Sequence, residues 1–325
     1  MELVAKAAPY LGQHGSTSPR LDAELLLAEA LGVGRMDLYL QFDRPLKSEE
    51  VDRFRELCRR RARGEPIAYI RGRREFMSVD LLVTPAVMIP RPETELLVEE
   101  ALRLAGVPKA ALARSLERNP AAPAGETLGD AGEPGEDDGA GGGGPTRDAV
   151  EPSPPAAAPP PCRVLDVGTG SGAIAVAIAV HHPGSRVVAT DLSPAALEVA
   201  SRNVERLELQ DRVELHRGDL AEGVDGPFDL VLANLPYIDR AWPDAVTAEV
   251  AGSEPETALY GGRDGLEIVG RLLDDLPRLL RPGGSALLEV DPRNAEHARQ
   301  LASGLGEVRV LKDLAGHERV LVVTA

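Results

Sequence analysis

The chain has 325 residues, with 36 basic and 52 acidic side chains that give a formal net charge of −16. Two cysteines are too few for a disulfide framework, the longest apolar run falls far short of the ~20 residues that cross a bilayer, and the acidic balance disfavours nucleic-acid binding. Because the chain opens on an amphipathic pattern and not on an apolar leader, we expect a cytoplasmic protein that is not embedded in a membrane.

The first block of the chain, residues 1–75, has a helical pattern. Leucine spacing predicts one helix that begins at Ser18-Pro19, and Ser48 opens another. Residues 53–74 carry nine arginines against two glutamates. This stretch is either a solvated helix face or a docking face for an acidic partner or nucleic acid. We assign residues 1–75 to a small helical domain.

A bridge and an unusual segment follow. Residues 76–106 bridge the two blocks, with a strand-like stretch over 79–84 and a helix that begins near Glu93. Residues 107–161 hold 11 of the 27 prolines and nine of the 33 glycines, and no aromatic residue. Such a composition buries too little apolar surface to offset chain entropy. We therefore predict a disordered acidic insertion over 107–161.

The last block, residues 162–325, alternates short apolar strands with helices. This alternation predicts an α/β fold with a doubly wound, mostly parallel sheet, ended by an antiparallel hairpin. The predicted strands are 163–167, 186–190, 213–216, 228–233, 285–290, 307–312 and 319–324, and the predicted helices are 172–181, 194–206, 266–280 and 294–304.

A glycine-rich turn follows the first strand of this block, in Asp166-Val167-Gly168-Thr169-Gly170-Ser171-Gly172. Glycines let the backbone approach a ligand, and a helix N-terminus favours an anionic group. Asp191, 19 residues after Gly172, can accept both hydroxyls of a ribose. These features alone also fit a dinucleotide. However, the charge of Asp166 beside the loop suits an ammonium group and disfavours a pyrophosphate.

The segment Arg217-Gly218-Asp219-Leu220 follows the third strand of the block, where a third cofactor loop is expected. The arrangement resembles S-adenosylmethionine (SAM)-dependent methyltransferases. In that resemblance Asp219 or Leu220 faces the adenine, and Leu220 forms an apolar wall.

The fourth strand of the block ends in Asn234-Leu235-Pro236-Tyr237. This element is close to the N-P-P-Y element of methyltransferases that modify planar amide or amino nitrogens. An amide nitrogen is a poor nucleophile, but an Asn oxygen and a backbone carbonyl can accept both of its N–H protons and hold it in line with a methyl group. Tyr237 can stack on the amide. Leu235 stands where the usual element has its first proline.

Further motifs make the resemblance specific. With the glycine turn and the Asn234 element, the chain resembles the peptide chain release factor N5-glutamine methyltransferase family (PrmC/HemK) over about 270 residues. The remaining matching segments are 18–27, 64–70, 89–95 (Ile-Pro-Arg-Pro-Glu-Thr-Glu), 254–255, 258–266 and 313–320.

The resemblance implies a class I SAM-dependent methyltransferase, with a doubly wound seven-stranded sheet and a small N-terminal helical bundle that grips the substrate. It implies methyl transfer to the glutamine amide of the Gly-Gly-Gln loop of release factors. The implied cofactor residues are Asp166, Gly168, Thr169, Gly170, Ser171, Gly172, Asp191, Leu192, Asp219, Leu220 and Asn234. The implied catalytic and substrate residues are Asn234, Leu235, Pro236 and Tyr237, and Arg91 and Glu93 line the same pocket.

Other interpretations stay open at this point. The same chemistry could act on a glutamine of a ribosomal protein. An adenine-N6 nucleic-acid methyltransferase would use a similar Asn-Leu-Pro-Tyr element, although the net charge speaks against it. A SAM-binding module without activity is disfavoured by the presence of Asn234 and Tyr237. The histidines show no metal-ligand spacing, and we expect a monomer without a metal.

Overall fold

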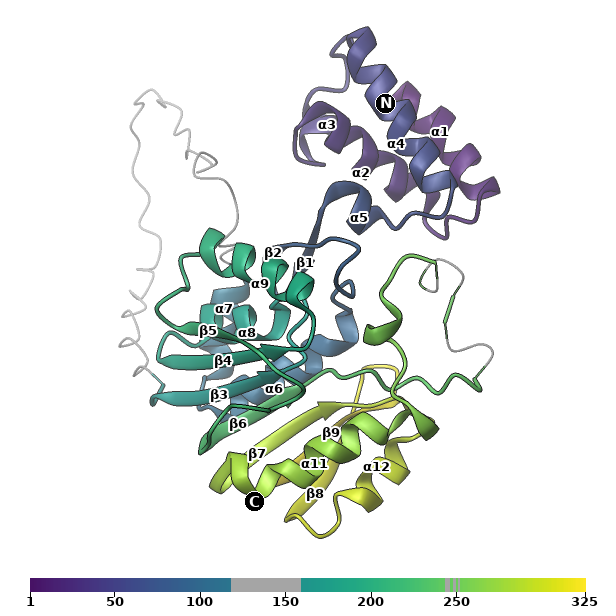
Figure 1. The fold of residues 1–325 in the computed structure, drawn as a ribbon. Coiled ribbons are helices and arrows are strands. Elements are labelled where there is room, and N and C mark those ends of the chain that lie inside the picture. The colour runs from purple at the N-terminus through teal and green to yellow at the C-terminus, as the bar shows by residue number, and fades with distance from the viewer. Residues whose placement is uncertain (118–158, 243–245, 248–249, 251) are drawn as a thin grey trace, which may run out of the picture.

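A computed structural model describes residues 1–117, 159–242, 246–247, 250 and 252–325, which form a helical lobe and an α/β lobe (Figure 1). The helical lobe contains α1 (Glu2–Gln13), α2 (Pro19–Leu31), α3 (Asp37–Leu40), α4 (Ser48–Ala62) and α5 (Ile67–Arg71). An antiparallel hairpin, β1 (Arg73–Phe76) and β2 (Val79–Leu82), connects it to the rest. The hairpin begins at Arg73, three residues before the bridge that the sequence predicts.

The helical lobe packs around its own small core. Leu11 of α1, Leu26 of α2 and Phe54 of α4 are almost fully buried in this core. Between α2 and α4, the Nε atom of Arg61 lies 2.8 Å from the Oδ2 atom of Asp22 in a buried ion pair. Seven of the nine arginines in residues 53–74 form ion pairs with acidic side chains: Arg53, Arg55, Arg59, Arg60, Arg61, Arg63 and Arg73. The basic stretch is therefore largely balanced within the lobe.

The α/β lobe contains one seven-stranded sheet in the order β5-β4-β3-β6-β7-β9-β8. Its strands are β3 (Cys162–Val167), β4 (Ser185–Asp191), β5 (Val213–Arg217), β6 (Phe228–Ala233), β7 (Leu280–Glu289), β8 (Glu307–Lys312) and β9 (Glu318–Thr324). Strands β3 to β7 pair in parallel, whereas β9 runs antiparallel to both β7 and β8. The predicted doubly wound sheet with a terminal antiparallel hairpin is confirmed.

Helices cover both faces of the sheet (Figure 1). One face packs against α6 (Glu95–Leu104), α7 (Lys109–Glu117), α8 (Ala173–His181) and α9 (Pro194–Arg206), and the other packs against α11 (Glu267–Leu279) and α12 (Ala295–Leu301). Short 3₁₀ helices lie at η1 (Pro92–Thr94), η2 (Glu256–Ala258) and η3 (Arg263–Gly265). Alternate residues of a strand point to opposite faces: Leu230 and Leu232 belong to the first core, and Val231 and Ala233 to the second.

The prediction of disorder from residue 107 onward is wrong for residues 107–117. Lys109–Glu117 form α7, and the apolar residues Ala111, Leu112 and Leu116 pack against the core of the α/β lobe. The hydroxyl of Ser115 also lies 2.7 Å from Nδ1 of His181 on α8. A few apolar side chains are enough to hold this helix in place, because α8 provides a surface for it to pack against. Residues 118–158 of the predicted insertion lie outside the described residues, and residues 159–161, just before β3, belong to no helix or strand.

Strand β7 is longer than its sequence pattern predicts. It begins at Leu280, five residues before the predicted start at Ser285, and the intervening Arg-Pro-Gly-Gly stretch gives no strand signal. The pairing with β6 shifts register between Phe228 and Leu230. This irregularity accommodates the extra residues of β7, as expected for a β-bulge.

None of the helices in the described part of the chain is both long and apolar enough to cross a membrane.

Asn203 of α9 connects the hairpin to the glycine turn. Its Oδ1 atom accepts the backbone N–H of Leu82 at 2.7 Å, and its Nδ2 atom donates to the carbonyls of Leu82 at 3.0 Å and Ser171 at 2.8 Å. The side chain is fully buried. All three backbone groups would lose this partner if the amide were removed.

We expect Asn203→Ala to lower the free energy of unfolding by about 2–4 kcal/mol, since buried polar groups without partners are costly. Urea denaturation measures the change. Ser201→Ala, at a partly exposed position on the same helix, is the matched control and should change stability by less than about 0.5 kcal/mol. Equal stability of both variants would contradict the structural role of Asn203.

Candidate active site

A cavity of about 410 Å³ opens at the carboxyl ends of β3, β4 and β6. This edge of a doubly wound sheet is where such folds bind ligands. Its volume suits a ligand of small-molecule size. The lining includes the predicted residues Gly168, Thr169, Gly170, Ser171, Asp191, Leu192, Asp219, Leu220, Asn234, Leu235 and Pro236, together with apolar residues such as Val87, Ile174 and Ile268.

The glycine turn forms one wall of this cavity. Gly168 has φ +72°, and a Cβ atom there would lie 2.9 Å from Cδ2 of Leu235. Gly170 has φ +57°, and its N–H donates to Oδ2 of Asp191 at 2.8 Å. A side chain at either position would be strained. The turn therefore requires glycine, and Leu235 packs directly against it.

Asp191 lies at the end of β4 with its carboxylate on the cavity. Its Oδ1 atom accepts the N–H of Ser193 at 2.8 Å, while Oδ2 accepts that of Gly170. Each carboxylate oxygen retains a second acceptor site. The neighbouring Leu192 also lines the cavity and is 62% exposed. The carboxylate is thus fixed in place and still able to accept hydroxyl protons.

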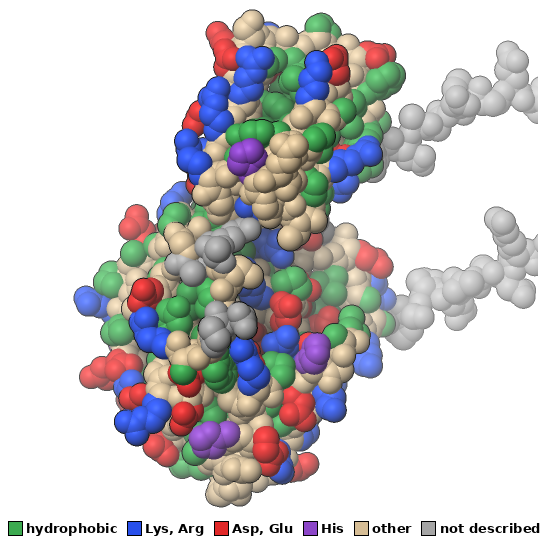
Figure 2. Space-filling view, turned by 90° about the vertical axis from the view of Figure 1, so that its right-hand side faces the viewer, with side chains coloured by type: hydrophobic (Ala, Val, Ile, Leu, Met, Phe, Trp, Pro, Cys, Tyr) green, Lys and Arg blue, Asp and Glu red, His purple; other side chains and the backbone are tan. Residues whose placement is uncertain are grey.

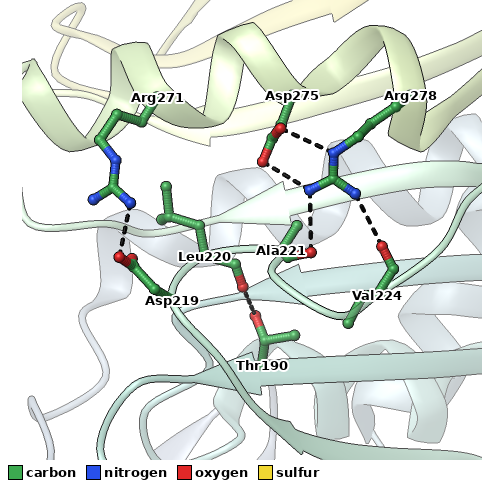
Figure 3. Close-up of polar contacts among 8 residues, drawn as sticks. All are labelled: Thr190, Asp219, Leu220, Ala221, Val224, Arg271, Asp275 and Arg278. Carbon is green, nitrogen blue, oxygen red and sulfur yellow. Dashed lines mark hydrogen bonds and ion pairs between the residues drawn. The ribbon is translucent and has the colours of Figure 1, made fainter.

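The third loop, which carries Asp219 and Leu220, is fixed from two sides (Figure 3). The hydroxyl of Thr190 on β4 donates to the carbonyl of Leu220 at 2.7 Å. From α11, Arg278 donates to the carbonyls of Ala221 and Val224, at 3.1 and 3.0 Å, and also bonds Asp275. Arg271 of the same helix forms a 2.7 Å ion pair with Asp219. Leu220, at φ +54°, is held against the cavity.

A second cavity of about 290 Å³ adjoins the first. Both cavities are lined by Asn234, Leu235 and Pro236, so they meet at this turn. Tyr237, Arg91 and Glu93 line the second cavity, as the sequence predicts for a substrate pocket. The lining also includes residues that were not predicted, among them Met88 and three charged side chains, Glu289, Asp291 and Arg319.

The turn at Asn234 is held by the motif at residues 258–266. The N–H of Ile238 donates to the carbonyl of Leu259 at 3.1 Å, and the N–H of Gly261 donates to the carbonyl of Ile238 at 3.0 Å. A Cβ atom at Gly261 would lie 2.4 Å from the carbonyl oxygen of Pro236. Sequence reasoning gave this motif no role, because its contacts are to a segment more than 20 residues away.

Arg91 donates to Oε1 of Glu254 at 2.5 Å, and the Glu254 side chain is fully buried. This ion pair connects the 89–95 motif to the Glu254-Pro255 motif, and Pro255 lines the first cavity. Two motifs that lie 163 residues apart in the sequence thus meet beside the site.

Comparison with known proteins places this geometry in a family. Residues 2–72 match the family described as the PrmC N-terminal domain, and residues 164–253 match the family described as a methyltransferase domain. The release factor glutamine methyltransferase of Rhodopirellula baltica is 40% identical, over 99% of this chain and 94% of that protein. Those of Geobacter sulfurreducens and Koribacter versatilis are 37% and 35% identical, over 96% and 97% of this chain and 92% and 95% of theirs.

The chain belongs to the release factor glutamine methyltransferase family. Its two family matches correspond to the helical lobe and to the part of the α/β lobe that carries the glycine turn, Asp191 and the turn after β6. The resemblance that the sequence motifs indicate is confirmed.

Two of the predicted cofactor residues in this family member do not line the cavity. Gly172, at φ +81°, precedes α8 and packs near Ala200 of α9, where an added Cβ would lie 3.3 Å from the alanine Cβ. Asp166 is fully buried behind the turn. Its Oδ2 atom accepts the hydroxyl of Thr169 at 2.6 Å and the N–H of Ala175 at 3.1 Å. Both residues shape the turn from behind.

Burial raises the pKa of Asp166 from 3.8 to about 7, against the effect of the hydrogen bonds from Thr169 and Ala175. The charged form of the Asp166 side chain therefore destabilises the folded chain. The sequence predicts a negative charge beside the loop; in the structure the Asp166 side chain lies buried beneath the turn and does not line the cavity.

The ionisation of Asp166 predicts a pH-dependent stability. Between about pH 4 and pH 7, the folded chain retains a proton that the unfolded chain has lost, so stability falls as the pH rises, by up to about 4 kcal/mol. Asp166→Asn, which stays neutral and can accept both hydrogen bonds, should lack this part of the fall. Denaturation of both proteins at about pH 5 and pH 7.5 measures how much each loses in unfolding free energy. Equal losses in the two proteins would exclude a contribution from Asp166.

Proposed function

We propose that this chain transfers a methyl group from SAM to the side-chain amide nitrogen, N5, of the glutamine in the Gly-Gly-Gln loop of peptide chain release factors. The observation that carries this proposal is the turn Asn234–Pro236, which lines both cavities. A methyl group held at the end of one cavity and an amide held in the other would meet there. The family membership of the full chain supports the same substrate.

The residues of the first cavity fit SAM. Its positive-φ glycines bring backbone close to the methionine part, the Asp191 carboxylate can accept the ribose hydroxyls, and Leu220 gives an apolar wall for the adenine. SAM, when bound, supplies a methyl group on a positively charged sulfur. We assign its binding to Gly168, Thr169, Gly170, Ser171, Asp191, Leu192, Asp219, Leu220 and Asn234.

Asn234 would hold the reacting nitrogen. Its Oδ1 atom and the backbone carbonyl of Leu235 can each accept one N–H proton of the substrate amide, which fixes the amide plane and directs the nitrogen lone pair at the first cavity. The ring of Tyr237 borders the second cavity, where it can stack on the amide. Leu235 replaces a proline of the usual element, but the carbonyl that it offers is backbone.

The charges around the second cavity also suit this reaction. The attacking nitrogen gains positive charge as the N–C bond forms, and carboxylates near it favour that change. Glu93, Glu289 and Asp291 line the cavity, and Asp291 also forms an ion pair with Arg293 at 2.7 Å. Arg91 and Arg319 are there as well, but each pairs with an acid: Arg91 with Glu254, and Arg319 with Asp313 at 3.0 Å.

The helical lobe is the proposed docking domain for the release factor. Figure 2 shows the surface hollowed in the α/β lobe, below the helical lobe, so that a protein bound to both lobes would cover the recess. The exposed arginines of residues 53–74, such as Arg55 and Arg63, could exchange their local ion pairs for acidic groups of a partner. We place the enzyme in the cytoplasm because release factors act on ribosomes, and we propose that it acts as a monomer.

Mass spectrometry after methylation with labelled SAM tests the substrate. Purified release factor, a ribosomal-protein mixture and adenine-containing DNA are offered separately. A single methyl group on the glutamine of the Gly-Gly-Gln loop is the expected result. Label on a ribosomal protein or on DNA, with none on the release factor, would move the activity to one of the two alternative substrates.

We expect Asn234→Ala to lower kcat by about 100-fold or more, because it removes one of the two acceptors that orient the amide nitrogen. The affinity for SAM should change by less than about threefold, as measured by calorimetry. Unaltered turnover would contradict the proposed mechanism.

Asp191→Ala, unlike Asn234→Ala, should weaken the binding of SAM. Loss of hydrogen bonds to a charged group typically weakens binding by about 10- to 100-fold, so the Kd for SAM should rise by this factor. Asp211→Ala removes an exposed carboxylate just before β5, at the opposite edge of the sheet, and serves as the matched control. Equal SAM affinity of the two variants would remove Asp191 from the cofactor site.

A further inference from the structure

A chain of hydrogen bonds leads from Asn234 to a buried carboxylate. The Nδ2 atom of Asn234 donates to Oγ1 of Thr94 at 2.9 Å, and that hydroxyl donates to Oε2 of Glu289 at 2.6 Å. The hydroxyl of Tyr237 donates to the other oxygen, Oε1, at 3.1 Å. Thr94 is 4% exposed and Glu289 is 1% exposed. These hydrogen bonds therefore connect three separate segments: η1, the turn after β6 and the end of β7.

The direction of these hydrogen bonds follows from which groups can donate a proton and which can only accept one. A carboxylate only accepts hydrogen bonds, whereas a hydroxyl has one proton to donate. Once Thr94 has donated its proton to Glu289, its oxygen can only accept from Asn234. An acceptor selects the NH₂ end of the amide, so Nδ2 faces Thr94. The carbonyl end, Oδ1, is left for the cavity side.

Both oxygens of Glu289 are needed for this arrangement. Burial raises the pKa of Glu289, and the nearby Glu93 acts in the same direction. The donors Thr94 and Tyr237 and the positive charge of Arg319 act against burial and favour the carboxylate. Burial is the largest of these effects, so the pKa of Glu289 stays raised. Both of its oxygens nevertheless act as acceptors in the structure, Oε2 for Thr94 and Oε1 for Tyr237, and this holds the Thr94 hydroxyl in one direction.

We propose that Thr94 and Glu289 are positioning residues that fix the side-chain amide of Asn234 with its oxygen toward the substrate nitrogen. This inference rests on the proposed role of Asn234 as an acceptor of the substrate N–H protons. The two orientations of an Asn amide have nearly the same shape. Without Thr94, the Asn234 amide could turn and present its NH₂ group to the N–H groups of the substrate amide. Two sets of donors would then face each other and repel.

Thr94→Val keeps the shape of the side chain and removes the hydroxyl. We expect it to lower kcat about 10-fold, because the hydrogen bond that holds the Asn234 amide is lost; a tenfold change corresponds to about 1.4 kcal/mol, within the range of one hydrogen bond. The KM and Kd for SAM should change by less than about twofold. Thr94→Ser restores the hydroxyl and should stay within about threefold of the original kcat. Thr84→Val, whose hydroxyl bonds only the nearby N–H of Ala86 among the described residues, is the matched control.

Glu289→Leu tests the other end of the chain. It leaves the Thr94 hydroxyl with Asn234 as its remaining partner, so Thr94 donates to Oδ1 and turns the amide the wrong way. The loss in kcat should be at least as large as that of Thr94→Val. Adding Thr94→Val to Glu289→Leu should then cause no further loss, because the misdirected donor is gone. Additive losses, with SAM affinity unchanged, would overturn the proposed chain.

A nuclear magnetic resonance measurement reads the hydrogen bond without any substrate. In protein labelled with ¹⁵N at asparagine, the side-chain NH₂ signal of Asn234 is identified by its loss in Asn234→Asp. That signal should move in Thr94→Val and stay in place in Thr94→Ser and Thr84→Val. An unmoved signal in Thr94→Val would overturn the inference, whatever substrate the enzyme uses. Failure of release factor methylation alone would instead overturn the proposed function.

Discussion

The parallel pairing of β3 with β6 is the constraint on which the rest of the site depends. Its register places Val167 opposite Ala233, so the two strands end side by side. The next residues, Gly168 and Asn234, begin the two loops that line the cavities. Parallel strands of a doubly wound sheet present their carboxyl ends at one edge. The meeting point of the cavities is therefore fixed by backbone hydrogen bonds and not by the loops themselves.

Each loop at this edge is held from outside the loop. Arg278 of α11 holds the loop of Leu220, the 258–266 segment holds the turn after β6, and Asn203 of α9 holds the glycine turn. Irregular backbone carries polar groups that must find partners when buried. Side chains of the neighbouring helices supply these partners. The loops of the site are therefore bonded to elements outside themselves.

Two buried carboxyl groups, Asp166 on β3 and Glu289 on β7, accept hydrogen bonds from threonine hydroxyls. Each threonine belongs to a segment that borders the first cavity. A buried polar group is costly unless it is hydrogen-bonded, and this cost gives such pairs a single preferred geometry. The same interaction thus fixes the glycine turn in one case and the Asn234 amide in the other. Asn203 and the hairpin β1–β2 extend this rigidity toward the helical lobe.

The sequence by itself determined the α/β fold, nearly all strand positions, the family and the residues of the two loops that meet. These follow from local signals: the alternation of apolar strands and helices, the glycine-rich turn, and motifs at strand ends. Only the tertiary structure decided that Asp166 lies behind the turn, that residues 109–117 form a helix on α8, and that Thr94 and Glu289 contact Asn234. The physical reason is that burial and hydrogen-bond partners depend on segments that are distant in the chain. Glu289 is an acidic residue at the carboxyl end of the apolar strand β7, a signal that could have identified it, but its partners come from two other segments.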